Sequence, residues 1–212
     1  MRCVLFLRQC FTVKSCCDEE SARRGNEHFR YTLCYNASAT KSKLRHKFGI
    51  CIMQWSDIIS DPHLRNIPYK IELNEYGQIV MTPHSFEHSA LQEVIADELK
   101  RWRPEGRTPP EFAIHTPKGT KSADVVWCSK KRFAKIRSLG GTEAMIAPEI
   151  CIEVLPPSNS QAEMTIKKQL YFEMGAEEVW ICDEKGCMTF YTLEGEQDAS
   201  LMFTAFPKKL EY

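Results

Sequence analysis

Ile150-Cys151-Ile152-Glu153-Val154-Leu155 is a short apolar run that carries a single carboxylate near its centre. An earlier run, Ser122-Ala123-Asp124-Val125-Val126-Trp127, has the same pattern. Both have the length and composition of buried β-strands. A charge inside such a strand costs several kcal/mol unless a partner or a cation compensates it. We therefore expect a functional site around Asp124 and Glu153.

These two carboxylates suit a metal ion if their strands are neighbours. Side chains alternate across a strand, so each carboxylate projects from one face, and neighbouring strands bring the two together. Two hard oxygen donors suit Mg²⁺, with Mn²⁺ as its substitute, and Mg²⁺ keeps several waters for a phosphate to replace. Such an ion activates water and neutralises charge on a phosphoryl oxygen. The two runs predict a Mg²⁺ site.

A lysine-bearing helix, Thr165-Ile166-Lys167-Lys168-Gln169-Leu170-Tyr171, follows the second run. Lys167 is placed to orient an attacking water or to stabilise the pentavalent state. Tyr171 follows on the same helical face, where it either contacts substrate or packs in the core. Lys168 is the competing candidate for the role of Lys167. The alternative for Lys167 itself is a surface ion pair.

The chain from residue 53 onward alternates strand and helix patterns. The first predicted strand, residues 69–73, has one polar face, and Asn74 and Gly77 supply the turn of its hairpin. Predicted strands cover residues 69–73, 78–81, 112–116, 122–127, 146–155, 178–183 and 187–193, with an edge strand over 201–206. Predicted helices cover residues 56–60 (capped by Ser56), 85–102, 129–139 and a segment after Ser158 or Asn159 whose buried stripe is Ala162, Ile166 and Leu170. This order predicts an α/β (α+β) fold in which a mixed central β-sheet is flanked by helices.

The first 52 residues differ in charge from the rest. They carry 10 Lys and Arg against 4 Asp and Glu, a net charge of +6, which leaves 18 against 24, a net charge of −6, for residues 53–212. We predict that residues 1–52 form a flexible basic extension, with Met53 as the functional start, and that residues 53–212 form one domain. The alternative is that the basic extension binds nucleic acid or a partner.

Cysteines and apolar segments indicate the compartment. The 10 cysteines form no Cys-x-x-Cys pair, which argues against a zinc or disulfide framework and for a reducing cytoplasm. The apolar residues near the start are interrupted by Arg8, so they are too short for a secretion signal or a membrane span. We predict a cytoplasmic protein without a membrane partner.

Three segments together carry a family resemblance. They are residues 148–158, 167–171 and 175–183, and the earlier matches are Glu72, Gly77, residues 79–81, His88 and Asp124. In this order and spacing, the segments resemble the Uma-type putative restriction endonuclease family, which belongs to the PD-(D/E)XK nuclease superfamily. The similarity covers about residues 53–195.

The resemblance implies a restriction-endonuclease-like core that hydrolyses DNA phosphodiester bonds with Mg²⁺. Asp124, Glu153 and the carbonyl of Val154 would hold the ion, and Lys167 would be the lysine moved from the strand to the helix. Glu72 matches an additional family acid. Leu155 stands where the parent motif has its lysine, and Ala123 replaces the proline of the motif. Because restriction-like nucleases often pair to cut both strands, a homodimer is a further expectation.

Other interpretations stay open. A catalytically idle binding or assembly module keeps the same fold, since fold does not certify function, and Leu155 fits this alternative too. An acid/base hydrolase of sugars is disfavoured because it leaves Lys167 without a role. His88 either caps its helix or approaches a phosphate, and the structural role is favoured. The basic segment 130–137 either follows a phosphate backbone or is a solvated helix face.

Overall fold

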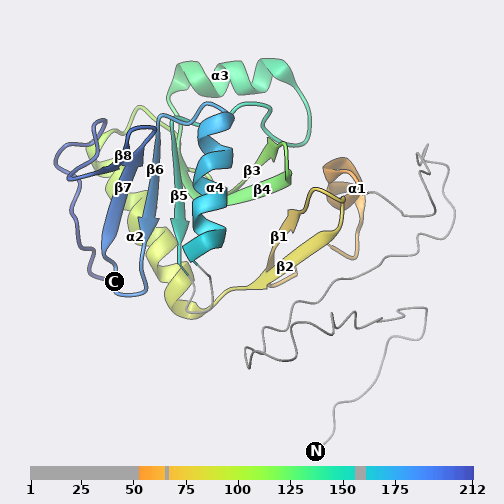
Figure 1. The fold of residues 1–212 in the computed structure, drawn as a ribbon, viewed down its shortest axis with the longest axis horizontal. Coiled ribbons are helices and arrows are strands. Elements are labelled where there is room, and N and C mark those ends of the chain that lie inside the picture. Colours follow the sequence, from red (N-terminus) through yellow and green to blue (C-terminus); the bar gives the residue numbers. More distant parts are fainter. Residues whose placement is uncertain (1–52, 65–66, 156–160) are drawn as a thin grey trace, which may run out of the picture.

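A six-stranded mixed sheet forms the centre of the protein. The computed structural model describes residues 53–64, 67–155 and 161–212. Within these residues the strand order is β3-β4-β5-β6-β7-β8 (Figure 1). The strands are β3 (Pro110–Thr116), β4 (Gly119–Trp127), β5 (Ile150–Val154), β6 (Glu178–Cys182), β7 (Met188–Thr192) and β8 (Gly195–Gln197). Neighbours are antiparallel except β5 and β6, which are parallel. The predicted mixed sheet is confirmed, and β4 and β5 are neighbours.

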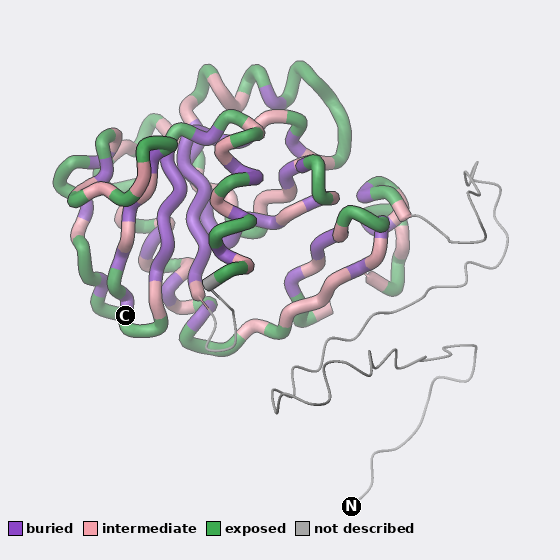
Figure 2. The backbone as a smooth tube through the Cα atoms, in the orientation of Figure 1, coloured by how far each residue is buried: buried purple, intermediate pink, exposed green. Residues whose placement is uncertain are grey.

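Helices cover both faces of this sheet. Helix α2 (Phe86–Trp102) lies behind the sheet in Figure 1, and α4 (Gln161–Glu173) lies in front of it. Helix α3 (Lys130–Leu139) lies across the end of the sheet where β5 begins. Helix α2 is capped by Ser85, whose hydroxyl accepts a hydrogen bond from the His88 N–H group. Figure 2 shows that β5 and β6 between the two layers are buried along their whole length.

A separate hairpin docks against the open side of β4. Strands β1 (Tyr69–Leu73) and β2 (Ile79–Pro83) form a two-stranded sheet, beside which lies α1 (Trp55–Ser60) (Figure 1). Gly119 starts β4 at a φ of 85°, and a Cβ atom there would lie 2.4 Å from the carbonyl oxygens of Leu73 and Asn74. The missing side chain therefore lets the end of the hairpin approach the β3–β4 turn closely.

Two large apolar clusters fill the space on either side of the sheet. The cluster under α2 contains Leu91, Ile95, Leu99, Val125, Trp127, Ile150, Ile152, Val154, Trp180, Cys182, Met188, Phe190, Phe203, Phe206 and Leu210. The cluster under α3 and α4 contains Ile114, Ala123, Val126, Cys128, Ile136, Ala144, Ala147, Cys151, Tyr171, Ala176 and Val179. Along residues 125–127 of β4 and 150–152 of β5, adjacent residues thus contribute to opposite clusters, in keeping with the period-two alternation.

Two predicted boundaries are wrong. The first helix starts after Gln54 and not after Ser56, because this phase buries Trp55 and Ile58 on one side. Strand β5 begins at Ile150 and not at residue 146, since Pro148 has no N–H group for the ladder.

The predicted edge strand over residues 201–206 is absent from the described structure. The edge is β8, and the segment turns instead, with the Phe203 N–H bound to the Ser200 hydroxyl and the Phe206 N–H bound to the Phe203 carbonyl. The turns bring both phenylalanines into the core, which decides against a strand. The predicted caps Ser158 and Asn159 lie outside the described residues. No helix of the described segments is long and apolar enough to span a bilayer.

Candidate functional site

Asp124 and Glu153 face each other across β4 and β5. Val125 pairs with Ile152 in the antiparallel register, so the next residues along, Asp124 and Glu153, are opposite each other on the α4 face. Their exposed fractions are 1% and 3%. The Val154 N–H donates to Asp124 Oδ2 over 2.8 Å, which ties this carboxylate to the β5 backbone. The expectation that the two acids meet holds in the structure.

Lys70 lies between these two carboxylates. Its Nζ is 2.7 Å from Asp124 Oδ1 and 3.1 Å from Glu153 Oε2, and only 6% of the residue is exposed. Lys70 is not among the site residues predicted from the sequence. The signal in the sequence was the polar face of β1, where Lys70 and Glu72 alternate with Ile71. In the structure this face packs on β4 and is not exposed to solvent.

Lys167 enters the same site from α4. Its Nζ lies 2.7 Å from Glu72 Oε1 and 3.3 Å from Glu153 Oε2, and the Tyr171 hydroxyl donates to Glu153 Oε1 over 2.5 Å. Glu72 Oε1 also accepts the Ser122 N–H at 3.1 Å, which docks β1 on β4. Lys70, Glu72, Asp124, Glu153 and Lys167 therefore form one buried group, here called the charge cluster.

The buried face of α4 differs from the predicted one. It contains Met164, Lys167, Leu170 and Tyr171, whereas Ala162 and Ile166 are exposed. The prediction assumed that the most apolar stripe of the helix is buried. In the structure, the acids of β1 and β5 compensate the Lys167 ammonium and make its burial favourable. Lys168 lies off this face, with its Nζ 3.4 Å from the centre of the Tyr191 ring. The structure thus places Lys167, and not the competing Lys168, at the charge cluster.

The start of α2 contributes a second group of polar side chains. His88 Nε2 lies 3.2 Å from Asp124 Oδ1, and Gln92 Nε2 lies 3.3 Å from the same oxygen and donates to Glu111 over 3.0 Å. The His84 ring stacks on the His88 ring with centroids 4.9 Å apart. The favoured capping role for the His88 side chain is wrong, because Ser85 caps the helix and the imidazole reaches Asp124.

Electrostatics separate the two facing acids. Burial raises the pKa of Asp124, but the Lys70 ammonium and the His88 hydrogen bond outweigh it and hold that pKa well below its usual value. Burial also raises the pKa of Glu153, and there the two lysines do not offset it fully. The carboxylates raise the pKa values of Lys70 and Lys167 despite burial, so both amines stay charged. Asp124 is thus the more firmly ionised of the two acids.

The donor set fits a hard dication that keeps water ligands. Asp124 Oδ1 and Glu153 Oε2 converge on one cation, the Lys70 ammonium, which marks a position where both carboxylates can serve a positive charge. Across the described segments, no three His, Cys, Asp or Glu side chains cluster as a metal cage. Mg²⁺ is bound through one or two carboxylates and retains waters, so two converging acids are sufficient. The Val154 carbonyl as a ligand stays a prediction.

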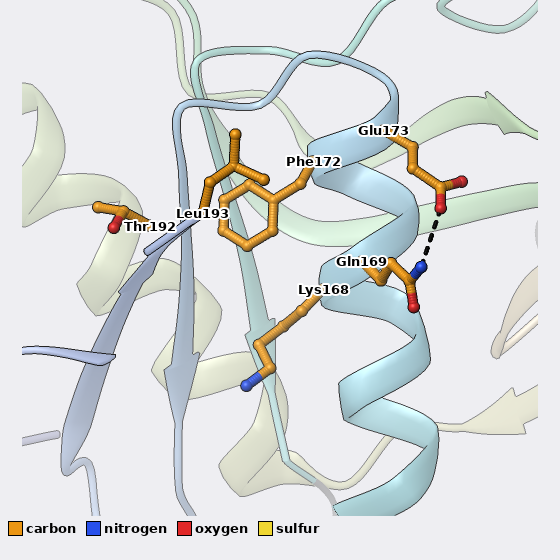
Figure 3. A pocket seen from close by; sticks show the side chains of 6 residues that line it. All are labelled: Lys168, Gln169, Phe172, Glu173, Thr192 and Leu193. Carbon is orange, nitrogen blue, oxygen red and sulfur yellow. Dashed lines mark hydrogen bonds between the residues drawn. The ribbon is translucent and has the colours of Figure 1, made fainter. Parts of the chain in front are cut away.

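A groove on the other side of α4 does not belong to this site. It has a volume of about 410 Å³ and is lined by Lys168, Gln169, Phe172, Glu173, Thr192 and Leu193 (Figure 3). None of these residues belongs to the charge cluster, which is filled by its own side chains. We therefore assign the candidate chemistry to the charge cluster and not to the groove.

The family model Uma2, described as "Putative restriction endonuclease", matches residues 62–208. The chain belongs to the Uma2 family. The matched residues contain the whole charge cluster with His88, Gln92 and Tyr171, and the resemblance expected from the sequence is confirmed. A search of curated proteins gave no match for this Uma2 chain.

One solved structure has a similar fold. The crystal structure of a putative nuclease belonging to DUF820 from Anabaena variabilis ATCC 29413 matches with a TM-score of 0.53. The match covers 66% of this chain and 86% of that chain at 19% sequence identity. At this identity the likeness shows the fold alone, a mixed sheet with flanking helices.

Proposed function

We propose that this Uma2 protein is a Mg²⁺-dependent endonuclease that hydrolyses DNA phosphodiester bonds and accepts Mn²⁺ as a substitute. The observation that supports it best is the convergence of Asp124 and Glu153 on one cationic position, with the Lys167 ammonium 3.3 Å from Glu153. Asp124, Glu153 and the Val154 carbonyl would hold the ion. When bound, the dication activates water and neutralises charge on the phosphate.

The residues of the chain have separate tasks in this proposal. Lys167 is the amine that orients the water or contacts the phosphate, and Glu72 fixes it from the opposite side at 2.7 Å. Tyr171 and the Val154 N–H orient the two ligand carboxylates through one hydrogen bond each. His88 positions Asp124 from α2. The cytoplasmic location, the homodimer and the basic extension over residues 1–52 remain predictions.

Cleavage of plasmid and single-stranded DNA by the purified full chain tests the proposal. We expect cleavage with Mg²⁺ or Mn²⁺ and none with EDTA, and losses of about a hundredfold or more for Asp124→Asn, Glu153→Gln and Lys167→Met. Lys168→Met is the matched control, since it removes the adjacent lysine and leaves the charge cluster intact. Cleavage that survives Asp124→Asn, or that Lys168→Met abolishes in place of Lys167→Met, would contradict the assignment.

The idle binding or assembly module is the second candidate, and Lys70 favours it. An ammonium already compensates the two acids, so the fold does not need a metal for its charges. Metal binding separates the two candidates. For the nuclease, millimolar Mn²⁺ raises the melting temperature of the wild type but not of Asp124→Ala or Glu153→Gln, because a ligand of the folded state stabilises it by mass action. Unchanged melting of all three proteins favours the module.

A further inference from the structure

Lys70 differs from the other ammonium of the charge cluster in its partners. Lys167 has an acid of its own, Glu72, at 2.7 Å, and is farther from Glu153 at 3.3 Å. In the described part of the chain, the ion pairs of Lys70 are with Asp124 and Glu153 alone, the two residues proposed to hold the dication. Both of these ion pairs of Lys70 are therefore with the proposed metal ligands.

The hairpin that carries Lys70 is anchored independently of this amine. Leu73 and Ile79 pack with Trp55 and Ile58 in an apolar cluster of their own. The Lys121 Nζ donates to the Leu73 carbonyl over 3.0 Å, and Glu72 accepts the Ser122 N–H. The contacts that dock β1 do not involve the Lys70 amine, and its flexible four-carbon stem allows the amine to move while these contacts stay in place.

An ammonium and a dication cannot occupy the same position between two carboxylates. The Lys70 Nζ already lies at hydrogen-bond distance from one oxygen of each acid, so an ion bound by those oxygens would be within a few ångströms of it. Like charges at such a separation in a buried site repel strongly. The ion therefore binds these two oxygens only if the Lys70 ammonium, which lies between them, moves away or loses its proton.

We propose that Lys70 is a built-in competitor of the dication: it holds Asp124 and Glu153 together in the metal-free protein and is displaced when the ion binds. The inference rests on the proposed function. In this competition, the free energy of metal binding is the difference between two interaction free energies. One is that of the ion with the carboxylates, and the other is that of Lys70 with the same carboxylates. Removal of the amine therefore tightens metal binding.

Mn²⁺ titration calorimetry on the full chain measures this competition. We expect Lys70→Met to bind Mn²⁺ at least tenfold more tightly than the wild type, because the variant keeps the length of the side chain and loses its charge. Lys168→Met is the control, with wild-type affinity expected, since its amine lies over the Tyr191 ring. Equal or weaker Mn²⁺ binding by Lys70→Met overturns the inference.

A labelling experiment on the wild type serves if Lys70→Met folds poorly. An amine-reactive reagent followed by mass spectrometry reports which lysines are accessible, and Lys70 is 6% exposed in the structure. We expect the labelling of Lys70 to rise several-fold when Mg²⁺ is added, whereas Lys167 stays protected by Glu72 and the labelling of Lys168 does not change. Continued protection of Lys70 at saturating Mg²⁺ overturns the inference.

The outcomes distinguish this inference from the proposed function. Binding of Mn²⁺ by the wild type with no gain in Lys70→Met refutes the competition and leaves the metal-dependent nuclease standing. Binding by Lys70→Met alone supports the competition and shows that Lys70 suppresses loading in the wild type. No Mn²⁺ binding by either protein rejects the dication site, and with it both proposals.

Discussion

Two regions of the central sheet, the aromatic part of the α2 face and the charge cluster on the α4 face, use opposite kinds of interaction. On the α2 face, Trp180 contacts Phe190 edge to face with centroids 5.1 Å apart and lies 4.7 Å from Phe206. On the α4 face, where β4 and β5 meet the hairpin, the charge cluster buries three carboxylates and two ammonium groups. The aromatic face stabilises the fold by burial of apolar area and ring contacts. In the charge cluster, burial of the charged groups costs desolvation free energy, which the ion pairs have to offset.

This contrast indicates that stability and function depend on different parts of the sheet. A well-packed apolar replacement is often as stable as a buried ion pair, so stability alone does not account for a five-residue charge cluster. Buried acids and amines with shifted pKa values gather at functional sites. The aromatic face is therefore expected to determine whether the chain folds, and the charge cluster to determine what it does.

The largest expected effect on stability comes from the aromatic face. Trp180→Ala removes the central ring and leaves Glu178 without the indole N–H that donates to it over 2.8 Å. We expect a loss of about 3–5 kcal/mol in the free energy of unfolding, measured by urea denaturation. Leu193→Ala, at a residue that is 75% exposed, is the control and should change it by less than about 0.5 kcal/mol. If Trp180→Ala lowers the free energy of unfolding only slightly, the aromatic region is not the main source of stability and the comparison fails.

Breaking one ion pair of the charge cluster is the next largest change. Lys167→Met leaves Glu72 and Glu153 without this amine, and we expect a loss of about 3 kcal/mol, at the low end for a broken buried pair because Lys70 remains. Adding Glu72→Gln should restore part of it, with a coupling energy of about 1–3 kcal/mol in a double-mutant cycle of urea denaturation. Additive effects would mean that the two side chains do not interact as the structure shows.

The acid side of the pH profile offers a smaller test of the same cluster. Because the pKa of Asp124 is held below its unfolded value of about 4, the folded protein binds fewer protons there than the unfolded chain. Its stabilisation is complete above about pH 4 and is lost as the pH falls toward the folded pKa. Urea denaturation from pH 6 to pH 2 should show a shallower decline for Asp124→Asn than for the wild type, by about 1–2 kcal/mol. Parallel curves would contradict the low pKa.

The smallest expected effect checks the orientation of α4. Ile166 is 45% exposed, whereas Met164 is 3% exposed. Ile166→Gln should leave the free energy of unfolding within about 0.5 kcal/mol, and Met164→Ala should lower it by about 2–3 kcal/mol. The reverse order in thermal or urea melts would mean that the apolar stripe predicted from the sequence is the buried face and that Lys167 does not face the acids.

The sequence was informative where a charged side chain stands within an apolar run. A carboxylate inside an apolar run has few stable solutions, so Asp124 and Glu153 could be singled out, and the lysine and tyrosine of the following helix joined them in the structure. The strand and helix patterns were also sufficient for the mixed sheet. Local boundaries failed at Ser56 and at residues 201–206, because distant packing of Trp55, Phe203 and Phe206 outweighed local preference.

By itself, the sequence determined that acids are buried in two strands of a mixed sheet with flanking helices, because alternation and composition are local properties. The fold decided that these two strands are neighbours. Only the tertiary structure decided which amines meet those acids. Lys70 comes from a hairpin more than fifty residues before Asp124, and the exposed-looking face of α4 turns inward at Lys167. Such pairings depend on long-range electrostatic compensation, which no pattern along the chain records.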